Sequence, residues 1–202
     1  MKFKLRYVLI PFFSLILTAL IVLFFLHIKR TITVYDYEKK LEACVQEGDI
    51  ICRLGDRIWS LYFKDLSPRD KRFSHLGIIH IVDNEIMVIN AEGISFDGQD
   101  KVCAEALPRF IKPASMLGVY RLQGVDGNKI SKEALKMLGR PFDWAFDHSN
   151  SEKIYCTELL YVALQEAAPE IELQTAKIFG KDIIPLEAIS SSPDFTEVLF
   201  LQ

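Results

Sequence analysis

The stretch FSHLGIIHIVDNEIMVINAEG, residues 73–93, predicts a β-hairpin. It contains two apolar runs, HLGIIHIV and EIMVINAE, which flank the dipeptide Asp83-Asn84. Aspartate and asparagine tolerate the positive φ angles of a tight two-residue turn, and the flanking runs are rich in strand-forming residues. The sequence therefore predicts two antiparallel strands joined by a short turn.

Three polar residues lie at the open end of this hairpin. With a two-residue turn, His75 lies opposite Glu92, and Asn90 lies one pair further along on the same face, because side chains alternate between faces. His80 is five residues from His75 and therefore faces the opposite side of the sheet. The hairpin thus brings an imidazole close to a carboxylate and a carboxamide.

A second stretch, IYCTELLYVAL at 154–164, places a lone cysteine, Cys156, at the start of a predicted helix. The first turn of a helix offers unpaired N–H groups and the positive end of the helix dipole, and both favour a thiolate. We therefore expect Cys156 to favour its nucleophilic form. The cysteine shares the core-facing side of the helix with an apolar stripe formed by Leu159, Leu160, Ala163 and Leu164.

These residues suggest the nucleophile, base and orienting group of a thiol hydrolase. Cys156 is the candidate nucleophile, His75 the candidate base, and Asn90 or Glu92 the candidate residue that orients the imidazole. Single cysteines in helices and single histidines at strand starts are nevertheless more often structural. The residue chemistry alone therefore suggests an active site without establishing it.

Other segments predict further helices and strands. An antiparallel hairpin beside segregated helices is typical of an α+β fold. The further predicted helices cover 35–46, 56–66 and 131–139, and the further predicted strands cover 48–55 and 116–123. The helix at 56–66 places four residues on its apolar side: Ile58, Trp59, Tyr62 and Phe63.

The N-terminal segment predicts a membrane anchor. Residues 7–28 form an apolar run long enough, as a helix, to cross the hydrocarbon core of a bilayer. No small-x-small cleavage site follows the run, which favours an uncleaved anchor over a cleaved signal peptide. We expect an anchor at 1–30, a linker helix at 31–46 and one catalytic domain at 47–202. The protein is then a single-pass membrane protein.

The charges bear on orientation and partners. Lys2, Lys4 and Arg6 precede the apolar run, whereas Lys29 and Arg30 follow it. The positive-inside rule thus favours, by a small margin, a cytoplasmic N-terminus and an extracytoplasmic domain. All 27 acidic residues follow position 30, and with them only 19 of the 24 basic residues. A domain this acidic is a poor candidate for binding nucleic acid or an anionic membrane surface.

The remaining cysteines and histidines indicate no metal site. The four cysteines show no CxxC spacing, so neither a zinc site nor a thioredoxin motif is predicted. Cys44 and Cys52 are a candidate disulfide if the domain is extracytoplasmic, and Cys103 is expected to be a small core residue. His148, with Asp143 and Asp147, matches no standard ligand spacing.

Aromatic residues beside the candidate site are possible substrate contacts. Trp144 precedes the cysteine helix and Trp59 follows the strand at 48–55. These residues are candidates for lining a substrate groove, with an ordinary core role as the alternative. Tyr155, beside the cysteine, is a candidate contributor to an oxyanion site through its hydroxyl or the neighbouring N–H.

Several motifs, taken in order, resemble the permuted papain-like amidase family, the YiiX kind, within the NlpC-like superfamily. They are GDI at the domain entry, SHLGI, GRPFD, YCTEL and a C-terminal P-x-x-I…SP, and they extend over residues 47–198. The resemblance implies a circularly permuted papain-like fold, in which an antiparallel sheet packs on the helix that carries the cysteine. In this permuted order the histidine precedes the cysteine, as His75 precedes Cys156 here.

The resemblance assigns Cys156 as nucleophile and His75 as base, and it places the third residue at Asn90. The family usually has glutamate at that position, so this chain departs from the common pattern, although asparagine is able to hold an imidazole. The hairpin register makes Glu92 the competitor. No metal or organic cofactor is required.

Three functions follow from these expectations. The first is a membrane-anchored cysteine hydrolase that cleaves an amide bond in a peptide or cell-wall-type substrate. The second is a lipid esterase or acyltransferase with the same Cys–His pair, as in the related lecithin:retinol acyltransferase branch. The third is a binding module that keeps the fold without turnover, which only the Asn-for-Glu exchange supports.

Overall fold

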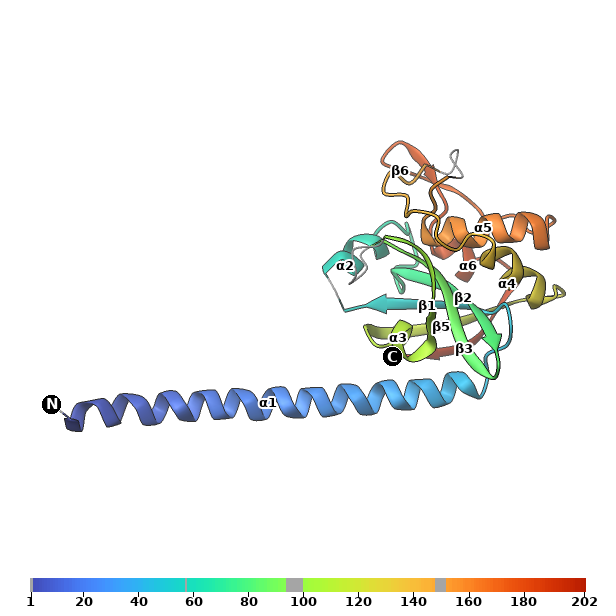
Figure 1. Ribbon diagram of the computed structural model, residues 1–202. Coiled ribbons are helices and arrows are strands. Elements are labelled where there is room, and N and C mark those ends of the chain that lie inside the picture. Colours follow the sequence, from blue (N-terminus) through green and yellow to red (C-terminus); the bar gives the residue numbers. More distant parts are fainter. Residues whose placement is uncertain (1, 57, 94–99, 148–151) are drawn as a thin grey trace.

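The computed structural model describes residues 2–56, 58–93, 100–147 and 152–202 (Figure 1). Of Trp59 only the backbone is described, so its predicted place in a groove lies outside the described side chains. The helices are α1 (Lys2–Glu42), α2 (Ile58–Lys64), α3 (Leu107–Ile111), α4 (Gly127–Leu135), α5 (Cys156–Ala167) and α6 (Glu187–Ser190). The strands are β1 (Ile50–Gly55), β2 (His75–Val82), β3 (Glu85–Glu92), β4 (Lys101–Ala106), β5 (Ala114–Leu122), β6 (Ala176–Ile178), β7 (Lys181–Ile183) and β8 (Phe195–Leu201).

The predicted hairpin is present as β2 and β3. Its strands pair antiparallel from Ile78–Ile89 to Val82–Glu85, which is the register of a two-residue turn. Asp83 and Asn84 have φ angles of 51° and 64°, as a tight turn of this kind requires. The hairpin forms the second and third strands of an antiparallel sheet of six strands in the order β4-β3-β2-β1-β5-β8.

The sheet has one hydrophobic core on each face. Because side chains alternate along a strand, Ile78 packs into the core beneath α4 and α5, whereas its neighbour Ile79 packs into the core beneath α1 and α3. Ile50 and Ile51 on β1 divide in the same way. The sheet is therefore covered on both sides, with α5 and its cysteine on one of them.

Helix α1 continues without a break from the apolar run to the domain (Figure 1). Its last turns bury Tyr37 and Leu41 against the sheet, so part of the expected linker, 31–46, lies in the core. Among the described residues one helix is long and apolar enough to cross a membrane, with a mean hydropathy of 2.3. That length and composition fit a membrane span and equally a signal sequence.

Two expectations on the smaller helices need correction. The apolar side predicted for 56–66 is not buried, because Ile58 and Tyr62 on α2 are exposed. Helix α4 begins at Gly127 rather than 131, because the side chain of Asp126 accepts a hydrogen bond from the N–H of Asn128 and caps the helix there. The α+β architecture, with an antiparallel sheet packed on the cysteine helix, is confirmed.

Candidate active site

Cys156 is the first residue of α5, and its thiol points back to the start of β2. The sulfur accepts hydrogen bonds from the backbone N–H groups of Leu76 and Thr157, both of which lower the pKa of the thiol. Burial outweighs them and raises the pKa of Cys156 to about 11. Burial thus opposes the thiolate that the helix start favours. Leu76 directly follows His75 along β2, but neighbouring side chains on a strand point to opposite faces, so this backbone contact places the thiol near the start of β2 and not directly against the imidazole.

His75 begins β2 and is nearly enclosed, with 12% of its side chain exposed. Its ring stacks on that of Phe110 from α3, with centroids 5.7 Å apart. Burial, and next the charge of Arg53, lower the pKa of His75 to about 4, while Glu92 and Asn90 oppose the shift. The imidazole is therefore neutral near pH 7, as a general base must be.

Asn90 contacts the imidazole directly. Its Oδ1 atom lies 3.1 Å from Nε2 of His75. Its Nδ2 atom donates to Oε1 of Glu105 at 3.2 Å and to the carbonyl of Val88 at 3.4 Å. Because both of these partners are acceptors, the amide is oriented with its oxygen toward the histidine. Nε2 then carries the ring proton, and Nδ1 is left to accept one.

Gly77 explains how Asn90 reaches the histidine. When the register printed from Ile78–Ile89 is continued, Gly77 lies opposite Asn90 and two residues from His75 along β2. A Cβ on Gly77 would lie 2.3 Å from Cγ1 of Val88 and 3.2 Å from Cβ of Asn90. A larger residue would therefore clash with Val88 and press on Asn90, which gives the glycine of the SHLGI motif a physical role.

Glu92, the competing third residue, is engaged elsewhere. Its Oε2 atom lies 2.8 Å from Nη2 of Arg53 and 4.0 Å from Nε2 of His75. Arg53 is buried, donates to the carbonyl of Phe110 at 2.6 Å and lies over the Phe110 ring at 4.3 Å. Glu92 thus neutralises a buried cation, while Asn90 makes the hydrogen bond to the base.

Sequence reasoning missed Arg53 and Glu105. Arg53 is the one charged residue in the otherwise apolar run IICRLG, and a charge inside a buried strand is a signal that it has a partner. Glu105 lies on β4, a strand that the sequence did not predict, and no local pattern marked it. Asn90 is paired with Cys103 across β3 and β4, which places Glu105 near the same amide.

Comparison with known proteins identifies this arrangement. The family described as "Permuted papain-like amidase enzyme, YaeF/YiiX, C92 family" matches residues 44–198. The chain belongs to this family. The family predicted from the sequence is thereby confirmed, and with it the class of papain-like cysteine amidases.

Among solved structures, the amidase fold of this chain is similar to the crystal structure of YiiX from Escherichia coli O157:H7. The two chains share 21% identity over 76% of this chain and 96% of that one, with a TM-score of 0.63. At this identity the likeness shows the permuted papain-like fold alone. No curated protein sequence matches the chain.

That YiiX structure is described as a metalloprotein. Within the described part of this amidase chain, no group of three or more His, Cys, Asp or Glu residues is arranged to hold a metal ion. His148, considered above with Asp143 and Asp147, lies outside the described residues. Asp143 uses both carboxylate oxygens for backbone N–H groups, those of Ala145 and Asp147.

The other cysteines of the amidase domain differ from expectation. Cys44 and Cys52 are both free thiols, and Cys52 points into the core, so the disulfide considered above is absent. Cys103 is partly exposed on β4 rather than buried, and its sulfur lies 3.9 Å from Nδ2 of Asn90. His80 faces away from His75, as predicted, and its Nδ1 lies 2.9 Å from Oε1 of Glu47.

Two aromatic residues near the candidate nucleophile have distinct surroundings. Trp144 is half-exposed, and its ring lies 4.9 Å from that of Phe142 and 6.5 Å from that of Phe63. Tyr155 is buried, and its hydroxyl accepts from the N–H of Ile184 at 3.3 Å. Its own N–H donates to Oε2 of Glu158 at 3.3 Å, so both polar groups proposed for an oxyanion site have partners.

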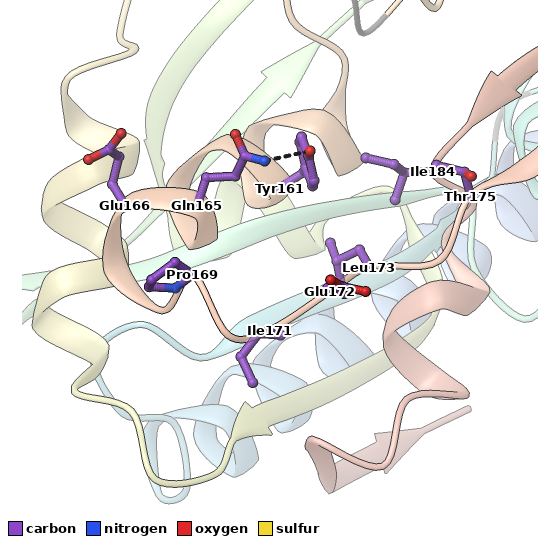
Figure 2. A pocket seen from close by; sticks show the side chains of 9 residues that line it. All are labelled: Tyr161, Gln165, Glu166, Pro169, Ile171, Glu172, Leu173, Thr175 and Ile184. Atoms are coloured by element: carbon purple, nitrogen blue, oxygen red, sulfur yellow. Dashed lines mark hydrogen bonds between the residues drawn. The ribbon is translucent and has the colours of Figure 1, made fainter.

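The hollow drawn in Figure 2 is separate from the amidase residues. It lies along the C-terminal half of α5 and the chain that follows, whereas Cys156 begins that helix. A hydrogen bond from Gln165 to the hydroxyl of Tyr161 crosses its rim. Its lining consists of Tyr161, Gln165, Glu166, Pro169, Ile171, Glu172, Leu173, Thr175 and Ile184.

Proposed function

We propose that this protein is a membrane-anchored cysteine hydrolase that cleaves an amide bond through Cys156, His75 and Asn90. One observation carries the proposal most: Nε2 of His75 is bound to Asn90, which orients the imidazole and leaves Nδ1 to accept a proton. This is the spatial logic of a nucleophile, a base and a group that orients the base.

The first step joins proton transfer to attack. With the pKa of Cys156 at about 11 and that of His75 at about 4, thiol and imidazole are both neutral near pH 7. The sulfur attacks the substrate carbonyl while its proton passes to Nδ1 of His75. The imidazolium that forms is stabilised by the Asn90 oxygen and by Glu92, whose carboxylate favours the charged ring.

Backbone N–H groups at the start of α5 receive the negative charge on the carbonyl oxygen. The N–H of Cys156 is the principal candidate, because the first N–H groups of a helix lack partners within it. The tetrahedral intermediate then expels the amine, which takes the proton from His75. Water, deprotonated by the same imidazole, hydrolyses the thioester and restores the thiol.

The expected substrate is a peptide or peptide-like amide. The amidase family supports this chemistry, and an extracytoplasmic domain would give it access to cell-wall-type peptides. Helix α1 supplies the anchor, since its apolar part is fully exposed and its last turns are packed on the domain. The site is therefore tied to the membrane surface by a continuous helix.

A lipid ester or acyl-transfer substrate is the second candidate. The observation that favours it is the same helix, because α1 holds the catalytic domain next to the bilayer. The Cys–His pair attacks an ester or thioester carbonyl by the same steps.

A substrate screen separates these candidates. The full-length protein, in detergent and in vesicles, is assayed on a panel of peptide amides and on phospholipid esters and acyl thioesters. We expect amide turnover that is lost in Cys156→Ala. Turnover of phospholipid esters alone would replace the first proposal with the second, and no turnover or acylation of Cys156 would contradict both.

A further inference from the structure

Helix α2 exposes apolar side chains without a partner in the domain. Ile58 is 77% exposed, Leu61 is 54% exposed and Tyr62 is 51% exposed. These three residues, here called the α2 face, fall within a single helix of seven residues. Scattered apolar residues on a surface are ordinary, but a group of this size on one short helix indicates a contact.

The end of the apolar part of α1 is fixed next to α2. Arg30, which closes the apolar run, pairs with Asp56, with Nη2 2.6 Å from Oδ2. The same guanidinium donates to the carbonyl of Lys112 at 2.8 Å. Asp56 lies two residues before α2 begins, so α2 starts at the level along α1 where the apolar run ends.

The direction of α1 sets the side of the domain that would face a bilayer. The helix is continuous from Lys2 to Glu42, and its C-terminal part is packed on α3. Figure 1 shows α2 projecting from the side of the domain that faces the N-terminal end of α1. A bilayer spanned by the apolar run would therefore meet α2 before the rest of the domain.

The candidate base lies next to the strand that leads into α2. Strand β1 ends at Gly55, just before α2, and its Arg53 is paired with His75 at the start of β2. The ring of Phe63 on α2 lies 6.5 Å from that of Trp144 and 6.0 Å from that of Phe146. The latter two residues belong to the loop that precedes Cys156. An aromatic surface thus links the α2 face to the nucleophile.

We propose that the α2 face rests in the interfacial layer of the bilayer that α1 spans, so that the active site opens at the membrane surface. The proposal rests on the anchor proposed above. Isoleucine and leucine side chains bind at the boundary between headgroups and acyl chains, and tyrosine is favoured there. The domain as a whole is acidic, but on this side Lys64 closes α2 and Lys112 is exposed beside Arg30, so local cations meet the headgroups.

This position narrows the substrate class. A site held at the interface meets amides or esters that are themselves anchored in the bilayer, with the scissile bond at headgroup level. Such a substrate diffuses in two dimensions to the site, whereas a soluble peptide has no such advantage.

Photo-crosslinking of the full-length protein tests the proposal without a known substrate. The protein is reconstituted in nanodiscs of phosphatidylglycerol and phosphatidylcholine that contain a phospholipid with a diazirine near the carbonyl end of one acyl chain. Cross-linked peptides are mapped by mass spectrometry. We expect lipid adducts on residues 7–28 and on α2, and none on the segment that follows α4, where Leu138 is 45% exposed, since α4 lies on the side of the domain away from α2 (Figure 1).

Two variants sharpen the result. Ile58→Glu combined with Leu61→Glu should abolish lipid adducts on α2 and leave those on α1 unchanged, whereas Leu138→Glu should change neither. Adducts on α1 with none on α2 would overturn the proposal while leaving the anchor intact. Absence of adducts on α1 would overturn the anchor as well. Labelling of Cys156 by an acyl probe in the same nanodiscs reports on the catalytic proposal separately.

Discussion

Asn90 and His75 are in hydrogen-bond contact, 3.1 Å from Oδ1 to Nε2, although they are not paired across the hairpin. Asn90 lies opposite Gly77, two positions from His75, and the two side chains meet on the diagonal. Glu92, which the register places opposite His75, is instead held by Arg53. The residue directly across the hairpin from His75, Glu92, is therefore not the one that makes the hydrogen bond to the imidazole.

Replacing Asn90 should impair catalysis more than replacing Glu92. We expect Asn90→Ala to lower kcat by roughly ten- to thousandfold, because the ring loses the group that fixes its tautomer. Glu92→Gln should be much milder, and Asn90→Glu, which introduces the commoner family residue, should retain activity. The measurement is kcat/KM on any substrate that turns over, with folding checked by circular dichroism. A crippled Glu92→Gln beside a near-normal Asn90→Ala would reverse the assignment.

Glu105 is expected to act as a positioning residue through Asn90. Its carboxylate accepts from Nδ2 of Asn90, so Glu105→Ala should free the amide to rotate and lower kcat by less than Asn90→Ala does. The decisive measurement is a double-mutant cycle. If Glu105 acts through Asn90, the double variant is no slower than Asn90→Ala alone. Additive losses would mean that Glu105 contributes independently of the asparagine.

The acid limb of the pH profile should lie below that of an ordinary histidine. The pKa of His75 is lowered from 6.5 to about 4, so kcat/KM should persist below pH 6.5 and fall as pH approaches 4. Arg53→Met removes a cation that lowers this pKa, so the acid limb should move to higher pH. Arg121→Met, which breaks a similar pair with Asp49, should leave the limb in place. An unmoved limb in Arg53→Met would contradict the electrostatic role.

The same shift has a consequence for stability. Because the folded pKa of His75 lies below the unfolded value, the unfolded chain binds the proton more readily between these values. The contribution of neutral His75 to the free energy of unfolding is full above pH 6.5 and is lost as pH falls toward 4. Urea titrations of the wild type at several pH values, set against His75→Gln, measure it.

Cys156 should be the residue that a thiol-reactive acyl probe labels. Cys156→Ala should abolish labelling and lower turnover by at least about a thousandfold, since the nucleophile is lost. Cys44→Ala is the matched control, because Cys44 is also a partly exposed thiol but lies away from His75. Cys103→Ala should likewise keep activity, although its sulfur lies near Asn90. Labelling of Cys156→Ala equal to that of the wild type would refute the assignment.

The two parts of α1 should separate in truncation. A chain starting at residue 31 retains Tyr37 and Leu41 in the core and should be soluble and folded, whereas the full-length chain should resist extraction from membranes by alkaline carbonate. A chain starting at 44 loses both side chains and should unfold at lower urea concentration. Leu41→Ala alone should lower the free energy of unfolding by about 2–5 kcal/mol. Equal stability of the two truncated chains would show that α1 adds nothing to the core.

The sequence predicted the hairpin and the cysteine helix well because each has a strong local signal. Alternation and the Asp83-Asn84 dipeptide specify the hairpin, and the start of α5 follows from its apolar stripe. Strand β4 was missed because KVCAEA, at the edge of the sheet, lacks a clear apolar run. Glu105 was missed with it, since its contact with Asn90 depends on how two strands pair.

Burial was less predictable than secondary structure. The start of α5 favours a thiolate in principle, but the enclosure of Cys156 raises its pKa, and no sequence pattern carries that information. Likewise the apolar residues of α2 indicated a buried side, although Ile58 and Tyr62 lie on the surface. An apolar side chain on a helix is buried only where another part of the same chain packs against it.

The two-residue turn at Asp83 and Asn84 sets the register between β2 and β3, and this register determines which side chain of β3 meets His75. One residue inserted there would shift the register of β3 by one position and place Ile89 where the carboxamide now meets the imidazole. A change at the exposed end of the hairpin would thus remove the hydrogen bond that orients His75 at the opposite end. A change in the length of this surface turn therefore alters the candidate active site, because the two-residue turn is what aligns Asn90 with His75.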